Sequence, residues 1–142
     1  MKTLDMQHIR YLNLFEKVCR VRPEYCFLYN SSIVFVLEKE GVSRAIGQEG
    51  RNTKKLYHIL GKKVKVVGKP SGVSEVKEFV TAIITPTSFR NIEVIGGDGE
   101  GGEIIIQAGK VNKANLIGRG KTRLVELQKV VRIYFGKELR VV

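Results

Sequence analysis

The chain has 142 residues, 43% of them hydrophobic, and its 25 Lys and Arg residues against 14 Asp and Glu give a formal net charge of +11. No apolar run approaches the roughly 20 residues that span a bilayer, and the N-terminus lacks the basic-then-apolar order of a secretory signal. We therefore expect a globular, cytoplasmic protein. The charge favours a polyanionic partner, either nucleic acid or an anionic membrane surface.

The first half of the chain is predicted to contain, in order, a helix, two strands, two helices and a strand. Pro23 ends the first helix, and two runs rich in β-branched and aromatic residues then form a hairpin. The last strand alternates Lys and Val, which indicates one solvated face. The predicted elements are Leu4–Val21, Tyr25–Tyr29, Ile33–Leu37, Val42–Ile46, Arg51–Leu60 and Lys62–Val67.

A second half with the same order follows the most linker-like segment, Gly68–Gly72. Two α+β domains are therefore predicted, residues 1–68 and 69–142. Because domains of about 70 residues bury little surface alone, we expect the two to pack on each other. The elements predicted in the second half are Val73–Ile84, Phe89–Ile95, Glu103–Ala108, Val111–Ile117, Thr122–Phe135 and Lys137–Val142.

Short identities indicate an internal duplication. Apolar runs that begin at Ile33 and Ile104 lie 71 residues apart, as do the Ile-Gly pairs that begin at residues 46 and 117. The final segments Gly61–Val67 and Gly136–Val142 match at a separation of 75 residues. The four extra residues, about one helical turn, fall in the last predicted helix. A repeat of this length predicts two domains rather than a solenoid of short units.

A glycine turn, Gly47-Gln48-Glu49-Gly50, joins the two later helices of the first half. Glycine permits positive φ and close backbone approach, and the helix that follows presents free amide N–H groups and a positive dipole end. Such a site fits a phosphate, as in the G-x-x-G loop of KH domains, which clamps about four nucleotides of RNA. Glu49 lowers the local positive potential. The predicted RNA-binding residues here are Gly47, Gln48, Glu49, Gly50, Arg44, Arg51 and Lys54, with Lys55 as a further flanking cation.

The second half carries a related turn, Gly118-Arg119-Gly120-Lys121, whose fourth residue departs from the G-x-x-G pattern. Two alternatives follow. Either the turn closes differently, with Gly120 in the permissive position, or the loop binds phosphate through cationic side chains. The predicted RNA-binding residues here are Gly118, Arg119, Gly120, Lys121 and Arg123.

Basic residues are concentrated around these two turns. Residues 110–140 hold nine basic residues and two acids, whereas residues 84–107 hold one basic residue and four acids. Such a surface is expected to bind nucleic acid with an affinity that falls as salt rises.

No catalytic, cofactor or metal site is predicted. The segment Gly96–Gly102 lacks the Gly-Lys-Ser/Thr ending of a phosphate loop and contains two acids, so a flexible hairpin tip is expected. Cys19 and Cys26 lack C-x-x-C spacing and are expected to be buried thiols. His8 and His58 lie on predicted helices with no nucleophile spaced beside either, which favours surface or packing roles.

The residues around the first turn resemble a known family. Leu14-Phe15-Glu16, Ile33–Val36 and Ala45–Asn52 are similar to the small archaeal NusA-like transcription factors, and the resemblance covers nearly the whole chain. It implies two tandem type II KH domains, each a three-stranded mixed sheet packed against three helices. It also implies RNA binding during transcription elongation, termination or antitermination. The polymerase-binding domain and oligonucleotide-binding barrel of the bacterial factor are not part of this pattern.

Three hypotheses for function follow. The leading one is a non-enzymatic transcription factor that binds single-stranded RNA, with RNA polymerase as a candidate partner and no membrane partner. The second is a ribosome-associated or RNA-processing KH protein. The third is a small nucleotide-dependent enzyme, against which the missing phosphate-loop lysine counts. The sequence leaves the oligomeric state open.

Overall fold

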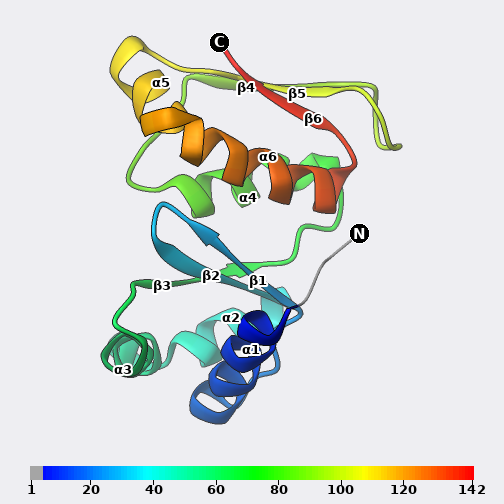
Figure 1. Ribbon diagram of the computed structural model, residues 1–142. Helices are drawn as coiled ribbons and strands as arrows, with labels where there is room; N and C mark the ends of the chain where they lie inside the picture. Colours follow the sequence, from blue (N-terminus) through cyan, green and yellow to red (C-terminus); the bar gives the residue numbers. More distant parts are fainter. Residues whose placement is uncertain (1–4) are drawn as a thin grey trace. The chain divides into compact units, whose positions relative to one another are not determined.

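The computed structural model describes residues 5–142, so the predicted helix start at Leu4 lies outside the described residues. The chain divides into two compact units, Met1–Lys69 (unit 1) and Pro70–Val142 (unit 2), one residue later than the boundary predicted after Gly68. Each unit is a two-layer arrangement in which helices cover one face of a sheet (Figure 1). Their internal structures are described separately below.

Unit 1 contains three α-helices and three strands within its described residues. Strands β1 and β2 are antiparallel and β2 and β3 are parallel, in the order β1-β2-β3. The second helix begins three residues earlier than Val42, and a 3-10 turn separates it from the third. The elements are α1 (Met6–Cys19), β1 (Tyr25–Tyr29), β2 (Ser32–Leu37), α2 (Lys39–Ile46), the 3-10 turn Gln48–Gly50, α3 (Arg51–Leu60) and β3 (Val64–Gly68).

The core of unit 1 lies between its sheet and its helices. Phe15 of α1 and Phe35 of β2 are fully buried, with ring centroids 4.4 Å apart. Leu56 of α3 and Ala45 of α2 bring the two helices of the glycine turn into the same cluster. Burial of large apolar side chains contributes about 1.5–3 kcal/mol each, so this cluster fixes the helix pair against the sheet.

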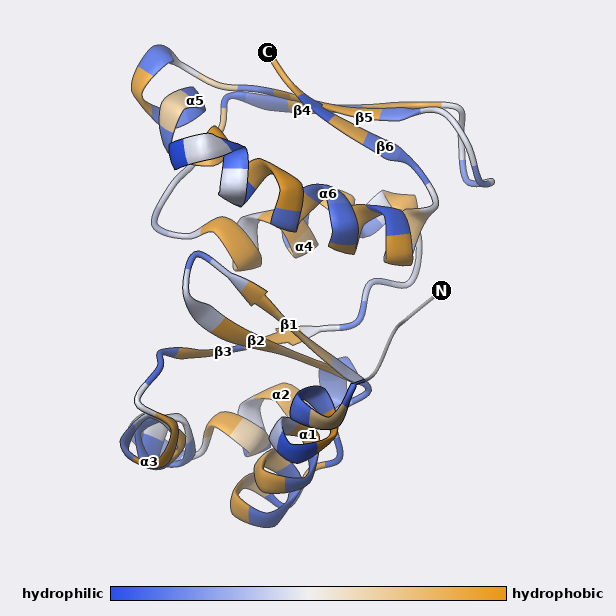
Figure 2. Cartoon of the chain, in the orientation of Figure 1, coloured by the Kyte–Doolittle hydropathy of each residue, from blue (hydrophilic) through white to orange (hydrophobic). Residues whose placement is uncertain are grey.

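Strand β3 does not have the solvated face that its Lys-Val alternation predicts. Val67 is buried and Lys65, on the same face, is half-buried. Burial, together with the nearby charge of Lys63, lowers the pKa of Lys65. The register places Lys65 and Val67 beside Val34 and Val36 of β2, which are fully buried, so burial on this face extends over both strands. Figure 2 shows β1 and β2 as mostly hydrophobic.

Unit 2 repeats this order with different lengths. Its sheet has the order β4-β5-β6, with β4 and β5 antiparallel and β5 and β6 parallel. A 3-10 turn, Val73–Glu75, replaces the first residues of the helix predicted from Val73. The elements are α4 (Val76–Ile84), β4 (Asn91–Ile95), β5 (Glu103–Gln107), α5 (Lys110–Ile117), the 3-10 turn Arg119–Lys121, α6 (Thr122–Phe135) and β6 (Glu138–Val141).

The predicted four-residue difference between the halves is confirmed in the helices that follow the glycine turns. Helix α3 has 10 residues and α6 has 14. Both end at a glycine in the left-handed conformation, Gly61 and Gly136. The added turn of α6 ends with Phe135, which is buried and lies 5.8 Å from the ring of Phe79 on α4.

Candidate nucleic-acid interface

The first glycine turn has a backbone that only particular residues adopt readily. Gly47 has φ 82° and ψ 171°, a region essentially restricted to glycine. Glu49 and Gly50 follow in the left-handed conformation, at φ 56° and φ 73°. The Gly50 amide donates to the carbonyl oxygen of Gly47 at 3.1 Å, which closes the turn. The chain therefore reverses within four residues and α3 begins at Arg51.

The side chain of Asn52 stabilises this turn. Its Nδ2 donates to the carbonyl oxygen of Ala45 at 3.0 Å, so the first turn of α3 is tied to the last turn of α2. A Cβ at Gly47 would lie 3.0 Å from the same nitrogen. Glycine at position 47 is thus required both by its backbone angles and by the space that Asn52 fills. Sequence reasoning assigned Asn52 no role, because a side-chain contact to a carbonyl seven residues earlier has no sequence signature.

The second turn has the same backbone as the first, so Lys121 does not change its closure, and Gly120 is left-handed as the first of the two alternatives allowed. Gly118 has φ 74° and ψ 171°, and Gly120 and Lys121 are both left-handed, at φ 64° and φ 63°. Gly120 takes the place of Glu49, and Lys121 that of Gly50. A non-glycine residue enters this region at a cost of about 1–2 kcal/mol, which the rest of the unit offsets.

Arg123 supports the second turn as Asn52 supports the first. Its Nη1 donates to the carbonyl oxygen of Asn115 at 3.1 Å. A Cβ at Gly118 would lie 2.9 Å from the Cγ of Arg123. The half-buried Arg123 side chain thus has a structural contact that its prediction as an RNA-binding cation did not anticipate. Arg119 and Lys121 are exposed.

An open pocket lies at the first turn. It has a volume of about 460 Å³ and is lined by Gln48, Glu49, Arg51 and Lys54. These side chains come from the turn and from the first turn of α3, so four of the predicted site residues surround one depression. Arg44 is exposed near the end of α2 but does not line the pocket.

Two amides of the first turn donate no backbone hydrogen bond within the described residues. The amides of Gly47, Gly50 and Arg51 donate within the turn, to the carbonyl oxygens of Ser43, Gly47 and Gln48. The part of the chain that the structure describes offers no acceptor to the amides of Gln48 and Glu49. They lie at the N-terminus of α3, where the helix dipole adds partial positive charge. The site therefore combines donors, a helix dipole and the cations Arg51 and Lys54, against one carboxylate.

The outer face of the unit 2 sheet carries three carboxylates, those of Glu93, Glu103 and Glu138, and one arginine, Arg140. Ile104, Ile106 and Leu139 are buried, so their neighbours along each strand face the other way. On that face the strand register places Ile95 opposite Glu103 and Glu103 opposite Glu138. Arg132 pairs with Glu138 at 2.8 Å and Arg140 with Glu103 at 3.3 Å. Figure 2 shows the alternation of hydrophobic and hydrophilic residues along β4–β6.

The glycine-rich segment Gly96–Gly102 is hydrogen-bonded to Lys137, a residue to which the sequence assigns no role. Lys137 is 1% exposed, and its Nζ donates to the carbonyl oxygens of Gly99 and Gly101 at 2.8 and 2.7 Å. The carbonyl groups of the segment thus face the ammonium. An unmatched buried charge is costly, and these carbonyls satisfy it.

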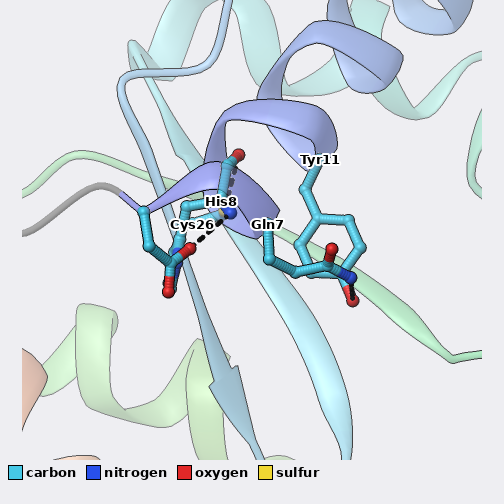
Figure 3. A network of polar contacts seen from close by, with 5 residues as sticks. Gln7, His8, Tyr11 and Cys26 are labelled. Atoms are coloured by element: carbon cyan, nitrogen blue, oxygen red, sulfur yellow. Dashed lines mark hydrogen bonds and ion pairs between the residues drawn. The ribbon is translucent and has the colours of Figure 1, made fainter.

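The two cysteines are buried free thiols, as predicted. Burial raises the pKa of Cys19 to about 11 and that of Cys26 to about 12. The Cys26 thiol donates to the carbonyl oxygen of His8 at 3.8 Å (Figure 3). Asp5 accepts from the amide of His8 and lies 2.7 Å from its Nδ1, and the hydrogen bond from the His8 amide lowers the pKa of Asp5. These groups secure the start of α1.

Residues 5–142 contain no cluster of three or more His, Cys, Asp and Glu side chains arranged to hold a metal ion. None of the helices in the same range has the length and apolar character needed to traverse a lipid bilayer.

Comparison with known proteins supports the fold. No protein-family model matches the chain, and no curated protein matches it. Among solved structures, the crystal structure of APE1850 superimposes with a TM-score of 0.66 at 25% sequence identity, covering 97% of this chain and 99% of that one. The predicted fold class is thereby confirmed: the chain is an α+β protein whose two three-stranded mixed sheets, each packed against helices, are those of two tandem KH-like domains.

Proposed function

We propose that this protein is a non-enzymatic, cytoplasmic RNA-binding factor of the NusA-like kind that acts in transcription elongation, termination or antitermination. The first glycine turn is its principal contact with single-stranded RNA. The observation that carries the proposal is the pairing of two unengaged amides with a cation-lined pocket at the N-terminus of α3. The resemblance to NusA-like factors supports the transcriptional role.

The chemistry of the pocket suits an RNA phosphate. The amides of Gln48 and Glu49 donate to a phosphate oxygen, and Arg51 and Lys54 neutralise its charge from the side. Glu49 opposes this attraction and keeps a single loop from binding tightly. Two loops on one chain compensate, because linked sites raise the effective concentration of the strand at the second site.

The second turn supports a second RNA contact. Its backbone angles at Gly118, Gly120 and Lys121 repeat those of the first turn. The exposed Arg119 and Lys121 add positive charge where the first turn has Gln48 and Gly50. RNA binding at this loop is therefore more dependent on cationic side chains and more sensitive to salt.

A double substitution in the first turn tests the proposal. Gln48→Asp with Glu49→Asp places two carboxylates beside the phosphate position and adds one negative charge, so RNA affinity should fall by about tenfold or more. Fluorescence anisotropy with a labelled single-stranded RNA measures the affinity, and circular dichroism checks folding. Asn13→Asp, on the exposed side of α1, is the control with the same change in net charge. Equal affinity in the double mutant and the control overturns RNA binding by this turn.

The transcriptional role is tested by what the protein accompanies in the cell. A tagged copy that co-purifies with RNA polymerase supports the proposal. Recovery of ribosomal subunits or an exonuclease instead favours the alternative, a ribosome-associated or RNA-processing KH protein.

A further inference from the structure

An exposed aromatic side chain lies on α3 beyond the pocket. Tyr57 is 49% exposed, and its ring centroid lies 5.8 Å from that of His58 at an interplanar angle of 30°. Leu56, between Lys55 and Tyr57 in the sequence, points to the core and is fully buried. A large ring that is half in water on a helix anchored in this way presents a rigid apolar surface.

The helix places this ring next to the cations of the pocket. Tyr57 follows Lys54 by three residues, and residues at this spacing are neighbours on a helix surface. Helical side chains lean toward the N-terminus of their helix, so Tyr57 lies over the turn that carries Lys54 and on the side of the glycine turn. Arg51, Lys55 and His58 are also exposed on α3. Helix spacing therefore makes Tyr57 the surface neighbour of Lys54, which lines the pocket.

We propose that Tyr57 is a stacking platform for one base of the RNA strand whose phosphate is held at the first glycine turn. The inference rests on the proposed RNA binding and extends it beyond the loop along α3. Stacking on an aromatic face tolerates every base, so the contact adds affinity without requiring one sequence. The positive charge of Arg51, Lys54 and Lys55 favours a nucleic-acid strand over a basic or apolar protein segment on this face.

Unit 2 lacks this platform. The residue at the same distance from the first glycine of its turn is Gln128, whose Nε2 donates to the carbonyl oxygen of Leu139 at 3.2 Å. Gln128 is therefore engaged with β6 and offers no aromatic face. The longer binding site belongs to unit 1.

The test compares RNA lengths in the intact protein. A four-nucleotide RNA fills the glycine turn alone, whereas an eight-nucleotide RNA also reaches along α3. With the longer RNA, Tyr57→Ala should weaken binding by about fivefold or more. Tyr57→Phe, which keeps the aromatic face, should bind within about twofold of the wild-type affinity. With the shorter RNA, Tyr57→Ala should have no effect. Ile59→Ala is the matched control, because Ile59 is 53% exposed on the same helix but has no π-face.

A base-deletion series completes the design. One abasic position in the eight-nucleotide RNA should reproduce the loss caused by Tyr57→Ala, and combining the two should add no further loss. An unchanged affinity of Tyr57→Ala for the longer RNA, or an equal loss with both lengths, overturns the stacking proposal while leaving binding at the turn intact. An equal loss in Ile59→Ala also overturns it. If the wild-type protein binds neither RNA, the proposed function fails as well.

Discussion

Gly47–Gly50 in unit 1 and Gly118–Lys121 in unit 2 follow the same backbone path although they share only their first residue type. In both, the first residue has a conformation restricted to glycine, and the third and fourth are left-handed. The glycine among the last two residues stands fourth in unit 1 and third in unit 2. The comparison teaches that this turn has glycine at its first position and at either its third or its fourth position. A strict G-x-x-G sequence is not required.

The two turns differ in what supports them. Asn52 fills the space behind Gly47 with an amide, and Arg123 fills the space behind Gly118 with an aliphatic chain that ends in a guanidinium. Both side chains donate to a carbonyl of the preceding helix. The two supporting residues hold equivalent positions, but their acceptors do not, because the residue that matches Ala45 is Leu116 and not Asn115.

The largest expected effect is that of removing either first glycine. Gly47→Ala and Gly118→Ala force a Cβ into a glycine-only conformation and against a supporting residue, so each should destabilise its unit by about 2–4 kcal/mol. Gly118→Ala should be the worse, because the new Cβ would lie 3.2 Å from the backbone nitrogen of Arg123, against 3.4 Å from that of Asn52 at the other site. Urea denaturation followed by circular dichroism measures both.

Gly72→Ala is the control for that pair. Its backbone is extended, and a Cβ there meets nothing within 4 Å. A loss of stability at Gly72 equal to that at Gly47 would show that the cost is general to glycine replacement and would contradict the requirement at the turns.

An intermediate effect on stability is expected from replacing the lysine that follows the last helix of each unit, Lys62 in unit 1 and Lys137 in unit 2. Lys137→Met keeps the aliphatic chain but removes two charge-assisted hydrogen bonds to the glycine segment, so unit 2 should lose about 2 kcal/mol. Lys62→Met, at the matching and exposed position of unit 1, should change stability by less than about 0.5 kcal/mol. Hydrogen exchange should also accelerate in residues 96–102 of the Lys137 variant. Equal effects of the two substitutions would contradict the assigned role of Lys137.

The smallest expected effect comes from replacing the one left-handed non-glycine residue of each turn. Glu49→Gly and Lys121→Gly relieve about 1–2 kcal/mol of backbone cost but add unfolded-state entropy, so each should gain about 0.5 kcal/mol. Their effects on RNA affinity should have opposite signs, because the first removes a negative charge and the second a positive one. Urea midpoints and anisotropy measure the two properties, and a shared sign for affinity would show that charge does not govern binding at the turns.

Sequence reasoning located both turns, the repeat and the added turn of α6, because glycine spacing and apolar periodicity are local properties. The sequence leaves the closure of the second turn open, since a left-handed lysine costs too little to be excluded by residue type alone. The burial of Lys137 is also not predictable from the sequence. The matching Lys62 is exposed, and the carbonyl groups that accept from Lys137 come from the longer β4–β5 connection. The covered face of β3 is not predictable from its own alternation, because burial on that face extends over Val34 and Val36 of β2 as well.

The acidic outer face of the unit 2 sheet gives that unit an electric polarity. Cations are concentrated on α5, α6 and the turn between them, on one side of the sheet, while Glu93 and Glu103 lie on the other. In the field of a polyanion, a unit with this charge distribution experiences a torque that turns its helices toward the polyanion before any contact forms. A larger share of diffusional encounters then begins in a productive orientation, and this advantage is lost beyond a Debye length of about 8 Å at physiological ionic strength.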